Sequence, residues 1–163
     1  MTVPNSKSKS AITQQAIIDA ASHILIEDGY NGFTLRKVAE AAGISIGNLN
    51  YHYPTKVALI NALLVHITNR IIAGFNEVAE RAGESPENRF RAVLEYWIDD
   101  LQTVETTVFF PEIWALANHH AFAKDTASRS YHHAHGILCP LVSALNPSLL
   151  PEKIDLIAKL ICA

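Results

Sequence analysis

Cysteine is nearly absent from this chain, which has only Cys139 and Cys162 among its 163 residues. Two cysteines give no disulfide framework, so a small secreted scaffold is excluded and a reducing compartment is favoured. Long apolar runs are also missing, because none approaches the about 18 residues that a membrane-spanning helix needs. The polar start contains Lys7 and Lys9 and lacks the apolar segment of a signal peptide. We therefore expect a cytoplasmic protein with no membrane partner.

A strong excess of one charge is missing as well, since the formal net charge is −3 at pH 7. The charge is divided unevenly: residues 1–56 carry +1 and residues 57–163 carry −4. A nearly neutral N-terminal part can still bind nucleic acid if its few cations and helix N-termini face the phosphates. So few charges predict only a moderate salt dependence of such binding for each subunit.

Sequence patterns of enzymes are absent too. There is no Gly-rich phosphate-binding loop, no His-Glu-x-x-His spacing and no evident pair of a nucleophile with its base. We therefore predict neither enzymatic activity nor a cofactor.

Period-two alternation is also missing, and apolar residues instead recur at helical spacing. The hydrophobic content of 49% excludes a disordered chain, and the pattern predicts an all-α fold. The expected helices cover roughly residues 11–29, 34–44, 45–53, 55–82, 86–104, 109–120, 122–145 and 151 onward.

The most informative segment is the short helix expected at residues 45–53. Ser45 is a good N-cap, Pro54 stops the helix, and Thr55 caps the next one. Upstream, a helix capped by Thr34 ends at Gly43, which can adopt the left-handed conformation of a tight turn. A helix, a glycine-containing turn and a short helix with a polar outer face form the pattern of a helix-turn-helix. The second helix of that motif enters the DNA major groove.

Residues 11–64 resemble the DNA-binding domain of the TetR family of transcriptional repressors. The resemblance rests on three motifs: Asp28-Gly29-Tyr30, then Ala42-Gly43-Ile44-Ser45, then the segment from Gly47 through Leu49, Tyr51 and His52 to Lys56. It implies an N-terminal helix-turn-helix domain followed by a helical ligand-binding and dimerisation domain. Two positions depart from the family pattern, because Asn50 replaces an aromatic residue and Tyr53 replaces phenylalanine. Asn50 can bond to a phosphate or to an adenine edge, so the departure bears on the operator sequence.

The resemblance and the side-chain chemistry together predict the residues that contact DNA. Ile46, Gly47 and Asn50 are the candidates for contacts with base edges. Tyr51, His52 and Lys56 are candidates for contacts with phosphates. The full predicted set is Thr34, Arg36, Ser45, Ile46, Gly47, Asn48, Asn50, Tyr51, His52 and Lys56.

Purely structural roles compete at several of these positions. Thr34 and Ser45 can act as caps alone, and Arg36 can be a solvated surface charge. Leu49 is expected in the core, and Tyr53 is expected to pack between helices with only its hydroxyl exposed.

The predicted organisation has three parts: a disordered arm at residues 1–10, the helix-turn-helix domain at 11–56, and an effector-binding and dimerisation domain at 57–163. The resemblance implies two long C-terminal helices that pair with those of a second subunit. The last helix starts at Pro151 and stops at Ala163 without a cap, so we interpret these dimerisation helices as incomplete. Its apolar stripe of Ile154, Ile157, Ala158 and Ile161 is expected to be an exposed association surface.

Aromatic residues crowd the segment between positions 97 and 131. Most aromatic residues at helical spacing belong to the core. Because the second domain of TetR-like proteins holds an apolar effector pocket, however, some of these rings are expected to line it. The candidates are Trp97, Phe110, Trp114 and Tyr131, with His119 as the polar contact.

Five of the eight histidines fall between His119 and His135. On a helix, His132 and His135 share a face, whereas His133 points about 100° away. Together with His119 and His120 they form a candidate site for zinc, nickel or copper. The alternative is that they are ordinary surface or pocket histidines.

From these features we predict a repressor that binds a palindromic double-stranded DNA operator as a homodimer. A small-molecule effector of unidentified structure is expected to release it. The alternative prediction is a metal-responsive regulator that uses His119, His120, His132 and His135.

Overall fold

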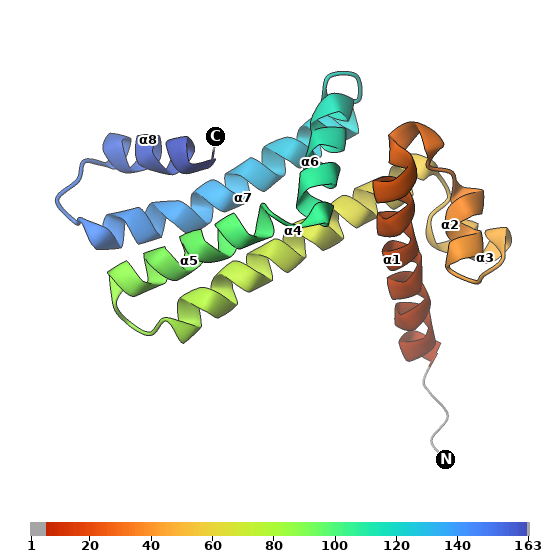
Figure 1. Ribbon diagram of the computed structural model, residues 1–163, viewed down its shortest axis with the longest axis horizontal. Helices are drawn as coiled ribbons and strands as arrows, with labels where there is room; N and C mark the ends of the chain where they lie inside the picture. The colour runs from red at the N-terminus through yellow and green to blue at the C-terminus, as the bar shows by residue number, and fades with distance from the viewer. Residues whose placement is uncertain (1–5, 163) are drawn as a thin grey trace, which may run out of the picture.

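The computed structural model describes residues 6–162, and these residues form eight helices and no strand. The predicted all-α fold is therefore confirmed. Figure 1 shows α1–α3 at one end of an elongated molecule and α5 and α8 toward the other, with α4 and α7 running between them and α6 next to α1. The helices are α1 (Ser6–Gly32), α2 (Leu35–Ala41), α3 (Ile46–His52), α4 (Lys56–Arg81), α5 (Pro86–Asp100), α6 (Val104–Ala117), α7 (Ala121–Leu145) and α8 (Pro151–Cys162).

Helix α1 starts earlier than predicted. Residues 6–10, assigned above to a disordered arm, are helical, and the Thr13 hydroxyl donates to the carbonyl of Lys9 at 3.0 Å. Residues 1–5 of that arm lie outside the described residues. At the other end the helix bends at Gly29, where φ is +63° and ψ is −179°. Glycine is suited to this bend because it has no Cβ to clash in the left-handed region. The predicted end at Gly29 is thus a bend followed by one further turn.

Helices α2 and α3 have the predicted caps. The Thr34 hydroxyl accepts the amide of Lys37 at 3.3 Å, and the Ser45 hydroxyl accepts the amide of Asn48 at 3.2 Å. Between the helices Gly43 has φ +66°, and the Ile44 amide donates to the carbonyl of Ala39 at 3.0 Å. This is the Schellman geometry that ends helices at a glycine. The caps and turn therefore fix where α3 begins.

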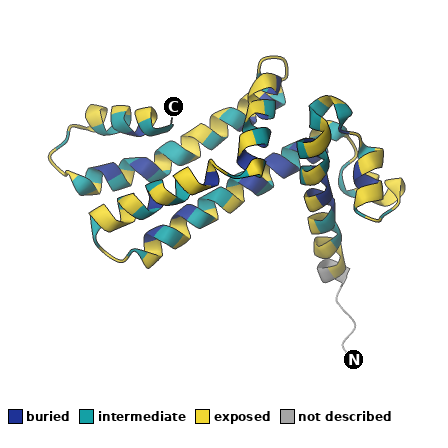
Figure 2. Cartoon of the chain, in the orientation of Figure 1, coloured by how far each residue is buried: buried dark blue, intermediate teal, exposed yellow. Residues whose placement is uncertain are grey.

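Helix α4 is the central helix of the fold. By length and composition alone it could cross a membrane, but it is the core helix of this molecule. It packs against α1, α5 and α7, and Figure 2 shows its buried residues concentrated where α1 and α6 meet it. The buried side chains along it are Leu59, Ile60, Leu63, Leu64, Ile67, Phe75 and Ala79.

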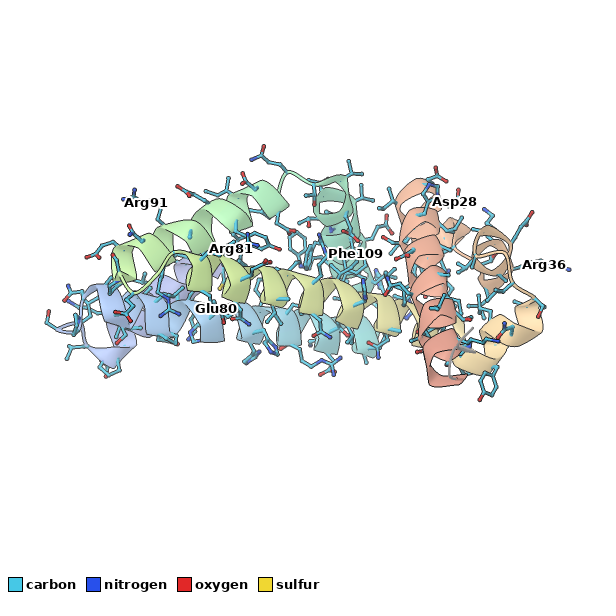
Figure 3. The ribbon with its side chains drawn as sticks, turned by 90° about the horizontal axis from the view of Figure 1, so that it is seen from below. Asp28, Arg36, Glu80, Arg81, Arg91 and Phe109 are labelled. Carbon is cyan, nitrogen blue, oxygen red and sulfur yellow. The ribbon has the colours of Figure 1, made fainter. Side chains whose placement is uncertain are left out.

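Helix α6 joins the two ends of the molecule. Phe109, Ile113 and Leu116 are buried in the same apolar cluster as residues of α1, α2 and α3. Figure 3 shows Phe109 in the interior, between α6 and the junction of α1 with α4. The N-terminal domain therefore shares one continuous core with α6, so that a shift of α6 also disturbs the packing of α1.

The start of α6 differs from the prediction. The break expected between residues 104 and 109 falls earlier, because Thr103 caps the helix by accepting the amide of Thr106 at 3.2 Å. The Thr106 hydroxyl also donates to Asp100 Oδ2 at 2.8 Å, which holds the corner between α5 and α6 together. Neither side-chain contact is encoded in the apolar periodicity that gave the prediction.

Helix α8 also differs in which face is exposed. The predicted association stripe turns toward α7: Ala158 is fully buried, and Ile154, Ile157 and Ile161 are partly buried. Leu156 and Leu160 are the exposed apolar residues on this helix, at 55% and 67%. The larger stripe packs inward because it removes more apolar surface from water.

Gly74, in the middle of α4, lies under the ring of Tyr96 from α5. A Cβ at position 74 would lie 2.0 Å from the Tyr96 hydroxyl oxygen and 2.1 Å from Tyr96 Cζ. The Tyr96 ring would therefore have to move away from α4. Tyr96 also packs edge-on against Phe75, with ring centroids 5.3 Å apart. The absence of a side chain at Gly74 therefore allows α4 and α5 to pack closely.

We expect Gly74→Ala to lower the free energy of unfolding by roughly 1 kcal/mol, because lost ring packing outweighs the gain in helix propensity. In a Tyr96→Ala background the same change should raise stability by roughly 1 kcal/mol, since only the propensity gain remains. Urea unfolding of the four proteins measures both effects. An effect of the same sign in both backgrounds would contradict this packing account.

Candidate nucleic-acid interface and cavity

Helix α3 stands on the N-terminal domain with nearly all of its surface free. Leu49 is its only buried residue and is fully enclosed, whereas Ile46, Gly47, Asn48, Asn50 and Tyr51 are exposed. Buried helices of globular proteins present an apolar stripe to their own core. Here one leucine anchors the helix and the remaining faces are polar or small, which is the arrangement of a helix that contacts another molecule.

The residues predicted to contact base edges lie together on α3. A Cβ added at Gly47 would have only Ser45 Oγ within 4 Å, at 3.9 Å, so nothing of the protein covers this position. Ile46 is 43% exposed, and the side chain of Asn50 is also exposed to solvent. A small residue permits close approach of the backbone, an isoleucine can pack on a thymine methyl, and an asparagine can pair with adenine. The geometry thus permits all three predicted contacts.

The predicted phosphate-contacting residues lie at the end of α3. Tyr51 is 85% exposed, and its ring meets the His52 ring edge-on with centroids 5.2 Å apart. His52 in turn lies 6.4 Å from the Tyr53 ring. Tyr53 is half-buried, and burial raises the pKa of its phenol, as expected for a ring that packs between helices.

Arg36, on the neighbouring helix α2, is an exposed cation with no acidic partner among residues 6–162. Figure 3 shows it at the outer end of the domain, pointing away from the core. The neighbouring Lys37 is paired with Asp28 at 2.8 Å. Thr34 caps α2 and remains exposed, so its cap bond leaves the hydroxyl hydrogen free to donate to an outside acceptor.

Lys56, predicted to contact a phosphate, already has partners inside the protein. Its ammonium turns inward, donates to the carbonyl of Tyr30 and lies 3.8 Å from the centroid of the Tyr30 ring. Burial lowers the pKa of this ammonium. A contact across 26 residues of sequence was not visible in the motif. Lys56 therefore joins α4 to the turn at the end of α1 and does not project toward solvent as a free charge.

We expect Lys56→Met to lower the free energy of unfolding by about 1–3 kcal/mol, because a charged hydrogen bond and a cation–π contact are lost. The salt dependence of DNA binding should remain unchanged, since the ammonium is held by the carbonyl and the ring of Tyr30. Lys37→Met is the matched control, because its exposed ion pair contributes about 0–1 kcal/mol. If Lys56→Met leaves the free energy of unfolding unchanged but makes DNA binding less dependent on salt, Lys56 contacts DNA and this account is contradicted.

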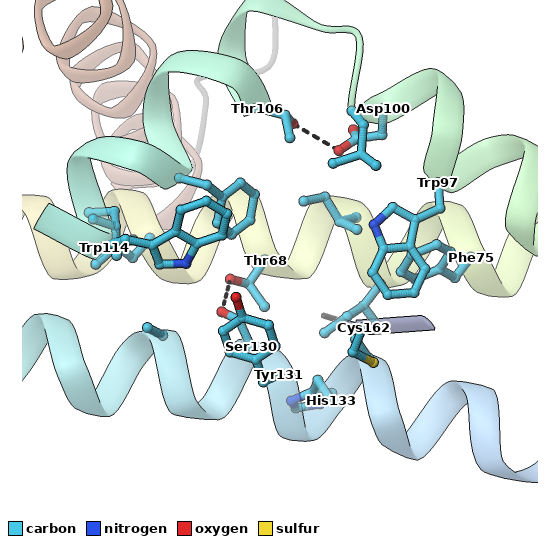
Figure 4. A pocket seen from close by; sticks show the side chains of 18 of the residues that line it. Thr68, Phe75, Trp97, Asp100, Thr106, Trp114, Ser130, Tyr131, His133 and Cys162 are labelled. Carbon is cyan, nitrogen blue, oxygen red and sulfur yellow. Dashed lines mark hydrogen bonds between the residues drawn. The ribbon is translucent and has the colours of Figure 1, made fainter. Parts of the chain in front are cut away.

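A cavity of about 640 Å³ lies in the second domain, among α4, α5, α6, α7 and the end of α8. Figure 4 shows its interior. Four of the five predicted pocket residues line it: Trp97, Phe110, Trp114 and Tyr131. Phe75 adds a fifth ring that was not predicted from the sequence. The volume is that of sites that bind drug-sized molecules.

His119, predicted as the polar contact, lies outside this cavity. It follows the last turn of α6, where its amide donates to the carbonyl of Leu116 at 3.0 Å. The polar groups come instead from positions spread over four helices. They are Thr68, Asp100, Thr106, Thr107, Thr126, Ser130 and His133. Asp100 was missed, although its spacing of three residues from Trp97 places both on one face of α5.

A chain of polar contacts leads from this cavity to the N-terminal domain. Arg70 on α4 lies 3.4 Å from Asp100 and 3.0 Å from Glu105. The Ser22 hydroxyl on α1 donates to the other oxygen of Glu105 at 3.3 Å. Asp100 lines the cavity, and Ser22 belongs to the helix on which α2 packs.

A second contact joins α6 to the bend in α1. Glu112 Oε2 accepts the amide of Tyr30 at 3.1 Å, next to Gly29. The carbonyl of the same Tyr30 accepts the Lys56 ammonium. Residue 30 thus connects α6, through Glu112, with the first turn of α4, through Lys56.

The candidate metal site does not form. His132 donates to the carbonyl of Ser128 at 2.7 Å, and His135 contacts Asp155 of α8 at 2.9 Å. His120 packs against Tyr30, with ring centroids 5.9 Å apart. No group of three or more His, Cys, Asp or Glu side chains that could hold a metal occurs within residues 6–162. The histidines are neighbours in sequence but face different parts of the fold.

The N-terminal domain matches a known family. The sequence model for bacterial regulatory proteins of the tetR family matches residues 17–63. The HTH-type transcriptional regulator BetI of Burkholderia ambifaria is 28% identical over 132 residues, which cover 78% of this chain and 66% of that protein. BetI of Burkholderia thailandensis is 32% identical over 56% of this chain and 47% of its own length. The chain thus aligns with less than two thirds of each relative.

Solved structures share the fold. A TetR-family regulator from Rhodococcus sp. superimposes with a TM-score of 0.74 at 24% identity, over 93% of this chain and 84% of its own. A regulator from Saccharomonospora viridis, solved in complex with choline, superimposes with a TM-score of 0.75 at 14% identity. The match covers 91% of this chain and 78% of that protein's chain. Both likenesses extend over the helical second domain as well as the helix-turn-helix. Motif, fold and relatives agree that this chain belongs to the TetR family of bacterial transcriptional regulators.

Proposed function

We propose that this protein is a repressor that binds a palindromic DNA operator as a homodimer and is released by a small-molecule effector, in the cytoplasm. The observation that carries the DNA-binding part is the exposure of α3, which is held by Leu49 alone and presents Ile46, Gly47 and Asn50 outward. A helix of seven residues contacts only a few base pairs, so two copies on successive turns of DNA are needed for a specific site.

A homodimer would need an association surface away from α3. The exposed leucines of α8, Leu156 and Leu160, support such a surface, because large apolar side chains that are adjacent on one helix face favour association. They lie at the opposite end of the molecule from α3 (Figure 1). A dimer joined there would leave both α3 helices free.

The effector part of the proposal rests on the cavity and on its contacts with the N-terminal domain. The choline complex of the Saccharomonospora viridis regulator supports the choice of a small molecule, since a protein of this fold binds one. An effector can release DNA only if it binds the non-binding conformation more tightly than the binding one. The contacts of α6 with Ser22 and Tyr30 offer a route by which a filled cavity would alter the orientation of α1.

Metal control is not proposed, because nothing in the described fold brings the histidines together.

Selection of bound sequences from randomised duplexes tests the proposal, with the full chain at two salt concentrations. We expect a palindrome whose half-sites lie about one helical turn, 10–10.5 base pairs, apart. Because few exposed cations surround α3, the affinity of the protein for this palindrome should fall only moderately as the salt concentration rises. Weak binding of all sequences, with no enrichment, would contradict a sequence-specific repressor.

A further inference from the structure

The charge of the cavity lining is one-sided. Asp100 is its only carboxylate, and none of the lining residues that the structure describes is a lysine or an arginine. An anionic molecule entering this cavity would lose hydration without gaining a lysine or arginine partner, at a large cost in free energy. The lining therefore disfavours acids and leaves a cation or a neutral molecule as the occupant.

Asp100 can bind a further partner, because its negative charge is not fully neutralised and its oxygens have unused acceptor sites. The residue is 7% exposed, and its carboxylate accepts the Thr106 hydroxyl at 2.8 Å. Arg70 lies 3.4 Å from Asp100 but only 3.0 Å from Glu105, so one guanidinium is shared by two carboxylates. This trio has one negative charge in excess. An ionised carboxylate has about four acceptor sites, and two are used here.

Aromatic rings surround the space that Asp100 faces. Trp97 precedes Asp100 by one helical turn on α5, whereas Trp114 comes from α6 and Tyr131 from α7. Figure 4 shows the two indoles on opposite sides of the cavity, with Tyr131 on the α7 side. Ring faces attract cations, tryptophan most strongly, and aromatic cages of this kind recognise substituted ammonium groups.

We propose that the cavity binds an organic cation with apolar substituents, whose charge lies near Asp100 and between the faces of Trp97 and Trp114. Asp100 supplies the opposite charge, and the rings and aliphatic side chains enclose the apolar part of the ligand. This inference rests on the proposed effector function for its biological consequence, but the binding specificity stands on the lining alone.

Three probes of similar shape and different charge test the proposal by calorimetric titration of the full chain at pH 7. They are 3-(trimethylammonio)phenol, its neutral counterpart 3-tert-butylphenol, and the anion 3-hydroxybenzoate. We expect the cation to bind about tenfold more tightly than the neutral compound, and the anion to bind most weakly. Equal or tighter binding of the neutral compound, or no binding of the cation at millimolar concentration, would overturn the proposal.

Two variants assign the preference to residues. Asp100→Asn should reduce the preference for the cation to about twofold or less, whereas Asp99→Asn, an exposed carboxylate on the same helix, should leave it unchanged. Trp97→Leu keeps an apolar side chain but removes the ring face, and it should weaken binding of the cation more than that of the neutral compound. This variant tests the cage independently if Asp100→Asn does not fold. A preference that survives in the folded variants would contradict the assignment.

The same probes separate this inference from the proposed function. If the cation binds selectively but leaves the affinity for the selected duplex unchanged, the cavity takes cations and the effector role is wrong. If the neutral compound binds best and releases the DNA, the effector role stands and the cationic specificity is wrong.

Discussion

Replacing Leu49 with alanine is expected to lower the free energy of unfolding by about 2–5 kcal/mol and to abolish specific DNA binding. Leu49 is fully buried and is the only residue by which α3 enters the core. Alanine would leave a cavity beneath the helix and remove the anchor that fixes its orientation. The two effects have one cause, because the outward positions of Ile46 and Asn50 depend on that anchor.

Urea unfolding and DNA-binding titrations measure the two effects separately. Asn48→Ala on the same helix is the control for stability, since Asn48 is exposed and its substitution should change the free energy of unfolding by about 0.5 kcal/mol or less. A loss of less than about 1 kcal/mol for Leu49→Ala would mean that other contacts hold α3, contrary to the burial described here.

Asn50→Ala should weaken binding by about 1–3 kcal/mol, and mainly through one base step in each half-site. The asparagine side chain lies free on the outer face of α3, where its amide can donate to and accept from an adenine edge. Alanine cannot replace either bond, so the variant should bind the original duplex and a duplex changed at that step with similar affinity.

Titration against duplexes that each carry one changed base pair reveals the position. Asn76→Ala, the same substitution on the exposed side of α4, controls for general effects on the protein. A uniform loss over all duplexes would assign Asn50 to a phosphate contact. Unchanged affinity would remove it from the interface.

Local sequence signals predicted the helix-turn-helix well because its geometry is local. Thr34, Ser45 and Thr55 each cap the helix that follows within three residues, and Gly43 alone supplies the left-handed turn. The family model and the relatives confirm the resemblance that these signals gave. The positions of the helices therefore followed from caps, turns and apolar spacing.

Contacts between distant segments could not be predicted in this way. Lys56 turns toward Tyr30, Glu112 binds the Tyr30 amide, and Asp100 rather than His119 enters the cavity. Each outcome depends on how two helices pack, which the periodicity of either helix does not define. The histidines illustrate the same limit, since His132 and His135 share a face and yet bond to different helices.

The contacts of α6 give the second domain a physical connection to α3. Glu105 and Glu112 both bond to α1, and Phe109, which lies between them in the sequence, is buried in the core shared with α1. Because packed cores shift between discrete arrangements rather than deform continuously, an occupant of the cavity that moved α6 would move α1 with it.

Dimethyl sulfate interference on the selected duplex tests the central claim, that α3 contacts the bases in the major groove. The reagent methylates guanine N7 in the major groove and adenine N3 in the minor groove, so one experiment compares both. We expect methylation of guanine N7 at or next to the contacted base pairs to block binding in two windows about one helical turn apart, because the added methyl group fills the groove that α3 enters. Interference only at adenine N3, or at no base, would contradict contact of the bases by Ile46, Gly47 and Asn50.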